Sequence, residues 1–259
     1  MHSVALITSY IANILASPLR RCQFHLRMFP AKLLARFQLG LHPKTLMPWV
    51  YTSMYDKHRS KGKGVYVKLH TKALEMFRTR QGFLAAFQKS VYYRVDMTDH
   101  VSRLTLTHAL KLLRQVPSHQ LRLLHPVPGS ASAPTRWQCM ESTEQQFHVA
   151  VNGFQCLLLL TSTPESPFID LGHEIQCKTL GTESAPVPES MSDTQIFRHI
   201  PCYDMRRLWS AEEIDEICHD IKREYPQLCT DSTFAIGIPK SIDTVDVAVA
   251  LWQCRALLR

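Results

Sequence analysis

Residues 146–161 (QFHVAVNGFQCLLLLT) place an Asn-Gly pair between two apolar runs, and no other stretch indicates the fold class as directly. A type I′ turn needs positive φ at both central positions, which Asn152 and Gly153 adopt more readily than other residues. The stretch therefore predicts a tight hairpin that joins strands at residues 146–151 and 154–161. Because residues 157–160 are all leucine, we expect the second strand to be covered on both faces.

Other segments predict both strands and helices. Alternation of apolar residues and short links predict further strands at residues 64–70, 136–141, 173–180 and 233–238. Apolar residues at helical spacing predict helices at residues 31–39, 71–94, 104–115 and 211–225, whereas residues 244–258 fit either element. We therefore expect an α+β protein with a basic helical N-terminal part, a central antiparallel meander and a mixed acidic C-terminal part.

Two of the expected helices have strong local signals. A buried stripe is predicted along residues 71–94, made of Leu74, Phe77, Leu84, Phe87 and Val91. At the second helix, Ser210 and Glu213 have the spacing of a capping box, and Pro226 follows the last turn. These signals predict where the second helix begins and ends.

Two linker-like stretches divide the chain into three regions. Residues 126–135 and 181–194 are rich in proline, serine and other small residues, which disfavours regular structure. The division predicts a basic, mainly helical region at 1–125, an antiparallel β region at 136–180 and an acidic α/β region at 195–259. We expect the third region to pack on the second.

Charge is distributed unevenly along the sequence. Residues 1–140 contain 21 lysines and arginines against four acids, whereas residues 141–259 contain nine against 18. The two halves therefore carry about +17 and −9, which give the net charge of +8. Such asymmetry predicts either an anionic partner for the basic half or neutralisation of one half by the other.

The opening of the chain has the pattern of a targeting helix. No acid precedes Asp56, and Val4, Ile7, Ile11 and Ile14 recur at helical spacing before a series of arginines. An amphipathic, acid-poor segment is typical of mitochondrial transit peptides, so residues 1–20 suggest import into the mitochondrion. A packed helix and a secretory signal remain the alternatives. The apolar stretch is too short to cross a bilayer, and we expect no membrane span.

A dense group of basic residues is the strongest functional candidate. Four of them lie in one glycine-containing segment and four in the strand and helix that follow: Lys57, Arg59, Lys61, Lys63, Lys68, Lys72, Arg78 and Arg80. Lysine and arginine neutralise phosphates, and tyrosines between them can stack on unpaired bases. The pattern predicts a non-catalytic protein that binds RNA or DNA. The alternative is a basic surface that faces solvent or pairs with the acidic tail.

No motif for catalysis or metal binding is present. The eight cysteines show no Cys-x-x-Cys pair and no zinc-type spacing with histidine, which favours free buried thiols. The histidines have no accompanying nucleophile signature. We therefore expect neither an enzyme nor a cofactor.

The helix predicted at residues 211–225 offers a second functional reading. Ile214, Cys218 and Ile221 share one face, and Tyr225 and Pro226 follow them. This pattern resembles the degenerate elongin-binding box of ubiquitin-ligase adaptors. The resemblance implies an interaction adaptor, of ubiquitin-ligase or viral accessory type, that binds a protein partner through the acidic half. Ordinary core packing explains the same apolar face.

Overall fold

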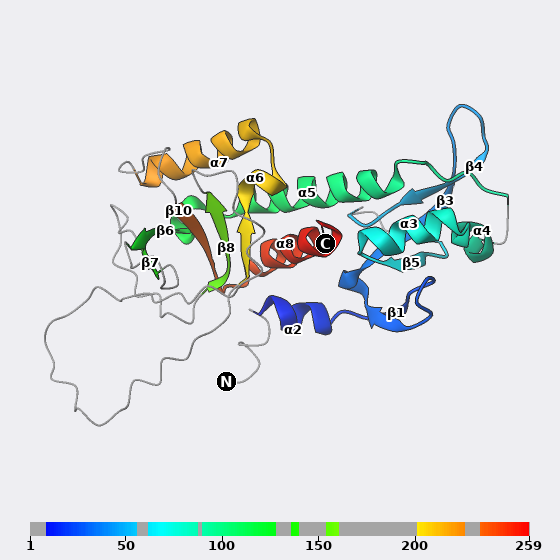
Figure 1. The fold of residues 1–259 in the computed structure, drawn as a ribbon, viewed down its shortest axis with the longest axis horizontal. Coiled ribbons are helices and arrows are strands. Elements are labelled where there is room, and N and C mark those ends of the chain that lie inside the picture. Colours follow the sequence, from blue (N-terminus) through cyan, green and yellow to red (C-terminus); the bar gives the residue numbers. More distant parts are fainter. Residues whose placement is uncertain are drawn as a thin grey trace, which may run out of the picture. The chain divides into compact units, whose positions relative to one another are not determined.

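The computed structural model describes residues 9–55, 62–87, 90–127, 136–139, 154–160, 201–225 and 234–258. The chain divides into two compact units (Figure 1). Unit 1 comprises Met1–Leu113 with Val245–Arg259, and unit 2 comprises Arg114–Thr244. Helices and sheets occur in both units, so the expected α+β class is confirmed.

Unit 1 is built on a three-stranded antiparallel sheet in the order β4-β3-β5, formed by Pro48–Thr52, Leu34–Leu41 and Val65–Lys68. Side chains alternate along a strand, so one face of this sheet carries Ala35 and Phe37 of β3, with Val67 of β5 beside Ala35. These residues are buried in one apolar cluster with Leu74 and Phe77 of helix α3 (Thr71–Thr79). Helix α3 therefore covers the apolar face of the sheet.

The helix expected at residues 31–39 is not formed. Residues Ala31–Leu33 make a short 3-10 turn, η1, and β3 begins directly after it. Apolar residues at 34, 37 and 41 fit a helix, whereas those at 35, 37, 39 and 41 fit a strand. Hydrogen bonding to β4 on one edge and to β5 on the other decides for the strand.

The long helix expected at residues 71–94 is divided. Helix α3 ends at Thr79, and α4 covers Gly82–Phe87. Between them Gln81 has a φ of 51°, a left-handed conformation that cannot continue a right-handed helix. Further on, Tyr92 N donates to Pro48 O and Tyr92 O accepts from Val50 N, both at 2.9 Å, so this residue pairs with β4. The predicted stripe still supplies core residues, because Leu74, Phe77 and Val91 are buried together.

Three more helices lie in the described part of unit 1. They are α2 (Tyr10–Leu15), most of α5 (Met97–Gln115) and α8 (Val245–Leu258). Helix α8 consists mostly of apolar residues, and its side chains from Val247 to Leu251 are all buried. The amide of Gln253 on α8 donates to Lys32 O at 2.7 Å, which ties the helix to η1. The end of the acidic tail therefore forms part of the core of unit 1.

The segment expected to target the chain contains α2, which packs against α8. Ile14 is buried, and the rings of Tyr10 and Trp252 lie 5.8 Å apart. This contact is the one that a packed helix would make. Residues 1–8 lie outside the described part of the chain, and mitochondrial import stays a prediction. After α2, the short strands β1 (Leu19–Arg21) and β2 (Met28–Pro30) pair with each other.

Unit 2 contains a five-stranded sheet in the order β7-β6-β10-β8-β9. Its strands are β6 (Arg122–Val127), β7 (Arg136–Cys139), β8 (Phe154–Leu160), β9 (Cys202–Asp204) and β10 (Phe234–Pro239). Every pair is antiparallel except β8 with β9. The strand β10 enters between β6 and β8, so the described strands do not follow one another as a meander.

All seven residues of β8 are buried, which confirms that this strand is covered on both faces. Its described neighbours are β10 on one edge and β9 on the other. The first strand and the turn of the hairpin expected at residues 146–161, like the strand expected at 173–180, lie outside the described residues. The hairpin therefore stays a prediction.

Helix α7 (Ala211–Glu224) follows the short helix α6 (Met205–Leu208) and begins as expected. Ser210 Oγ accepts from Glu213 N at 3.3 Å, and Glu213 Oε2 accepts from Ser210 N at 2.9 Å. This reciprocal pair is the predicted capping box. After the helix, the Tyr225 hydroxyl donates to Leu121 O at 3.3 Å, next to the 3-10 turn η2 (Ser118–Gln120).

The buried glycine of β10 provides a test of this sheet. A Cβ at Gly237 would lie 2.4 Å from Phe154 Cε1 and 2.9 Å from Leu124 Cδ1. Gly237→Ala is therefore expected to lower the free energy of unfolding by about 1–3 kcal/mol through overpacking, as urea denaturation would measure. Gly40→Ala in β3 is the comparison and should cost less, because the added methyl would meet only the Tyr51 side chain, at 3.0 Å, and not two buried side chains below 3.0 Å. Equal stability of Gly237→Ala and the parent would contradict the packing described.

Candidate functional site

The face of the unit 1 sheet opposite α3 is polar and aromatic. In the strand register Arg36 pairs with Tyr66 and Gln38 pairs with Tyr51, so each pair shares a face. Because side chains alternate along a strand, these residues lie opposite Phe37, and Trp49 lies on the same side as Tyr51. One face of the sheet thus packs in the core, and the other carries the cation of Arg36, three aromatic rings and the buried amide of Gln38.

A cleft of about 700 Å³ lies between part of this face and helices α5 and α8. The sheet contributes Arg36 and Tyr66, α5 contributes His108, and α8 contributes Asp246 and Gln253. The start of the chain adds Arg20 and Lys32. Among the described residues that line the cleft, three are lysine or arginine and one is acidic.

The Arg36 guanidinium makes one hydrogen bond to the protein and has a second nitrogen without a hydrogen-bond partner among the described residues. Its Nη2 donates to Gly62 O at 3.2 Å, whereas its buried Nε has no hydrogen-bond partner in the described part of the chain. The guanidinium lies over Gly64, where a Cβ would come within 2.6 Å of Nε. The absence of a side chain at Gly64 therefore leaves room for Arg36, and a buried unpaired N–H favours an anionic ligand.

The other two cations of the cleft differ in how far they are neutralised. Lys32 Nζ lies 3.6 Å from Asp246 Oδ1 and also donates to Asn13 Oδ1. Arg20 is exposed, and its Nη1 donates to Leu19 O at 3.1 Å. Asp246 therefore offsets much of the charge of Lys32, and Arg20 and Arg36 supply most of the net positive charge.

One wall of the cleft is a fixed aromatic pair. The rings of Tyr55 and His108 stack at 3.9 Å and 21°. The Tyr55 hydroxyl lies 3.1 Å from Gln253 Oε1 and 3.2 Å from Thr105 Oγ1. Burial raises the pKa of Tyr55 and lowers the pKa of His108, although Asp246 opposes the second shift. His108 is therefore neutral at pH 7, and the positive charge of the cleft does not come from it.

The structure describes five of the eight basic residues predicted to bind nucleic acid. Lys57, Arg59 and Lys61 lie outside the described residues. Lys63 is exposed and lines a smaller cavity of about 240 Å³ with Gln38 and Tyr51. Lys68 is half-buried, with Nζ 5.6 Å from the centre of the Phe29 ring.

Of the remaining three predicted residues, Lys72 and Arg78 lie on α3, and Arg80 directly follows its last residue. Lys72 and Arg80 are exposed, and Arg78 is half-buried. Because α3 covers the apolar face of the sheet, these residues lie on the side away from Arg36. The predicted residues that the structure describes therefore do not form one continuous surface.

The residues of the cleft could not be identified from the sequence. Interpreting residues 31–39 as a helix hid the alternation that places Arg36 opposite Phe37. Arg20, Lys32 and Asp246 lie far apart along the chain, and only the fold brings them together. The one local signal was the alternation of Leu34, Arg36 and Gln38 with Ala35 and Phe37.

The residues predicted to bind a protein partner lie in the interior of unit 2. Ile214, Cys218 and Ile221 are 6%, 3% and 3% exposed. They form the inner face of α7, which packs near η2 and α6. A partner could reach this face only if α7 left its place, so ordinary core packing accounts for the pattern.

Cysteine chemistry does not point to an active site. Five free cysteines are buried (Cys22, Cys156, Cys202, Cys218 and Cys254), and burial raises the pKa of Cys254 to about 12. Cys22 Sγ lies 3.3 Å from His25 Nδ1, but the thiol is fully buried and no substrate can reach it.

The described residues contain no group of three His, Cys, Asp or Glu side chains that could hold a metal ion. None of the helices in this part of the chain is both long and apolar enough to cross a membrane. Comparison of the chain with family models, curated proteins and solved structures finds no match.

Proposed function

We propose that unit 1 binds single-stranded nucleic acid along the face of the β4-β3-β5 sheet that α3 leaves uncovered. The observation that carries this proposal is the combination on one face of Arg36 with Tyr66, Tyr51 and Trp49, beside a cleft that Arg20 and Lys32 also line. Guanidinium groups bind phosphate oxygens, and aromatic rings stack on bases. A sheet face with both is a platform for an extended strand.

The charge of unit 1 supports an anionic ligand. Its described residues contain 15 lysines and arginines against four acids, which are Glu75, Asp96, Asp99 and Asp246. Two of these acids already have cationic partners, because Asp96 pairs with Arg94 at 2.7 Å and Asp246 lies near Lys32. Neutralisation inside the unit therefore leaves a large positive excess. That excess supplies the sequence-independent part of nucleic-acid affinity.

The aromatic residues favour a single strand over a duplex. Trp49, Tyr51 and Tyr66 are each partly exposed. Bases in a duplex stack on one another and offer only their edges, whereas unpaired bases can stack on protein rings. An aromatic contact of this kind contributes about 1–3 kcal/mol per base. A single strand can therefore gain stacking energy on this face that a duplex cannot gain.

Arg20→Gln with Arg36→Gln tests the proposal. The double variant should weaken binding to a labelled single-stranded RNA and reduce the magnitude of the salt slope by about 1.4 units, about 0.7 for each single-strand phosphate that is no longer neutralised. Fluorescence anisotropy across a salt titration measures both quantities. Stability should barely change, because Arg20 is exposed and glutamine keeps a hydrogen-bond donor at position 36.

The matched control removes the same charge from the opposite side of the sheet. Lys72→Gln with Arg80→Gln changes two exposed cations, one on α3 and one directly after it, and should leave the salt slope within about half a unit of the parent. Equal losses in the two double variants would show diffuse attraction instead of a site. Equal affinity of the parent for duplex and single strand would contradict stacking on the aromatic face.

A further inference from the structure

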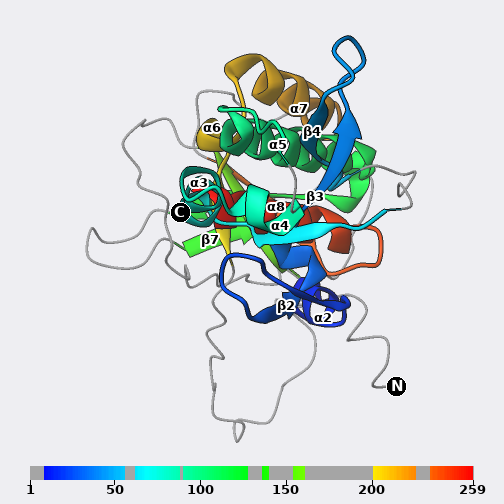
Figure 2. The ribbon, with the colours of Figure 1, turned by 90° about the vertical axis from the view of Figure 1, so that its right-hand side faces the viewer.

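The hairpin that joins β3 to β4 exposes apolar side chains at its tip. Leu41, Leu46 and Met47 are 68%, 70% and 43% exposed. Figures 1 and 2 show this hairpin extending beyond the sheet of unit 1. Clustered exposed aliphatic side chains are unfavourable in water and indicate a surface that another phase or molecule covers.

The backbone of the turn can be transferred from water into an apolar phase with a small desolvation penalty. His42 N donates to Met47 O at 2.9 Å, and Leu46 N donates to His42 O at 2.8 Å. Thr45 N donates to His42 Nδ1 at 3.3 Å, and Pro43 has no N–H. Most donors of the turn are therefore paired within it, which removes the largest penalty for insertion into an apolar phase.

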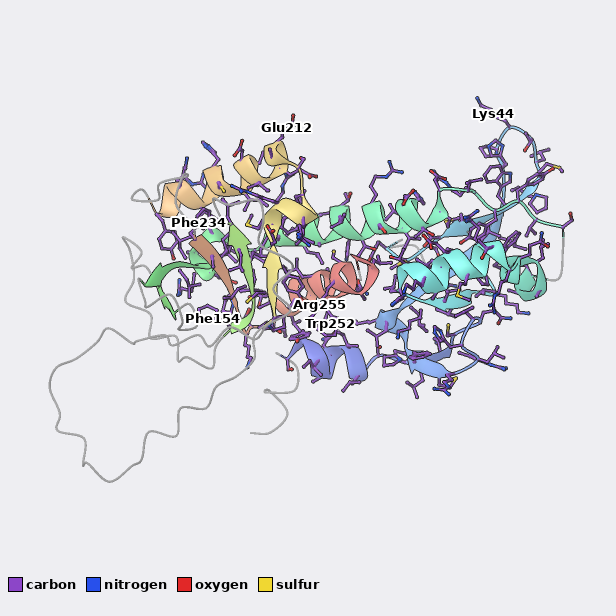
Figure 3. The ribbon with its side chains drawn as sticks, viewed as in Figure 1. Lys44, Phe154, Glu212, Phe234, Trp252 and Arg255 are labelled. Carbon is purple, nitrogen blue, oxygen red and sulfur yellow. The ribbon has the colours of Figure 1, made fainter. Side chains whose placement is uncertain are left out.

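The charge at the tip of the hairpin distinguishes between a protein and a membrane as its partner. Lys44 is the only lysine, arginine or acid in residues 41–47, and Figure 3 shows its side chain pointing outward from the turn. Lysine is depleted in the apolar centres of protein–protein interfaces. At a membrane surface the same residue extends its ammonium group to lipid phosphates while its stem lies among acyl chains.

An aromatic group lies next to the aliphatic tip. The rings of His42 and Trp49 lie 5.2 Å apart, and those of Trp49 and Tyr92 stack at 6.0 Å. Tyr92 is 51% exposed. Tryptophan and tyrosine concentrate at the level of lipid headgroups, where one part of the ring system meets water and another the acyl chains.

From these observations we infer that the β3–β4 hairpin inserts its tip into the surface of an anionic lipid bilayer. Leu41, Leu46 and Met47 enter the acyl region, Lys44 pairs with lipid phosphate, and Trp49 and Tyr92 lie at the headgroups. Phosphates of a nucleic acid would gain nothing from the three aliphatic side chains. This inference rests on the exposed tip of the hairpin and not on the cleft, and Trp49 is the one residue that both proposals use.

Flotation of the full chain with vesicles tests the inference. We expect the parent to float with vesicles of phosphatidylcholine and phosphatidylserine and much less with phosphatidylcholine alone. Leu41→Ser, Leu46→Asn and Met47→Ser together should weaken binding at least about tenfold, because three apolar groups are no longer buried in lipid. Asparagine suits position 46, where φ is 55°. Lys44→Ala should reduce the preference for anionic vesicles about fivefold.

A matched variant removes exposed leucines elsewhere in unit 1. Leu15→Ser, Leu19→Ser and Leu26→Asn change three side chains that are 64%, 55% and 60% exposed, and Leu26 also has a φ of 55°. This variant should float as the parent does. Because the hairpin variant keeps every charge, its unchanged flotation would show attraction by charge alone and overturn the inference. Failure of the parent to float would also overturn it.

Discussion

Replacing Phe77 by alanine is expected to lower the free energy of unfolding of unit 1 by about 3–5 kcal/mol. Phe77 is 1% exposed and lies between α3 and the apolar face of the sheet. Its ring stacks on that of Phe37 at 6.0 Å and meets the edge of Tyr93 at 6.1 Å. Alanine removes both ring interactions and leaves a cavity that the surrounding strands can fill only in part.

Urea denaturation would measure the loss, and hydrogen exchange of β3 and β5 would assign it to unit 1. Leu15→Ala is the control, because this side chain is 64% exposed and its truncation should change stability by no more than about 0.5 kcal/mol. A loss below about 1 kcal/mol for Phe77→Ala would mean that α3 does not pack on the sheet as described.

Elements that depend on local signals could be predicted from the sequence. Helix α7 begins at the expected capping box because Ser210 and Glu213 bond within one turn. The strand character of β5 and the two-sided burial of β8 were also visible as alternation and as a run of leucines. In each case the interactions that decide the structure lie within a few residues.

Elements that depend on distant partners were missed. The segment that forms β3 has apolar residues at both helical and strand spacing, and its pairing with β4 and β5 decides between them. The position of β10 between β6 and β8 likewise depends on residues far apart in the sequence.

The candidate site likewise depends on residues that are far apart in the sequence. The lysines around position 63 revealed a high density of positive charge, but not which face of the sheet would carry it. That face follows from the register that places Arg36 beside Tyr66 and opposite Phe37. Lys32 and Asp246 reach the cleft through the packing of η1 and α8, and Arg20 reaches it from β1, which no local pattern encodes.

In unit 2, replacing Leu157 by alanine is expected to cost about 2–5 kcal/mol of stability. Leu157 is fully buried and packs in a cluster with Leu124, Phe154, Leu159, Cys202 and Ala235. It lies on β8, which β10 and β9 border on its two edges, and its N–H donates to Pro201 O at 2.9 Å. Because neighbouring strands fix the backbone on both sides, the sheet cannot move to fill the space that the leucine leaves.

Leu157→Met tests whether stability depends on the volume of the side chain at position 157 or falls with any substitution there. Methionine has nearly the same volume and should cost less than about 1.5 kcal/mol. Hydrogen exchange of β8 and β10 in the two variants would locate the effect, with protection lost in Leu157→Ala and largely kept in Leu157→Met. Equal destabilisation by alanine and methionine would mean that shape, and not a cavity, limits the packing of β8.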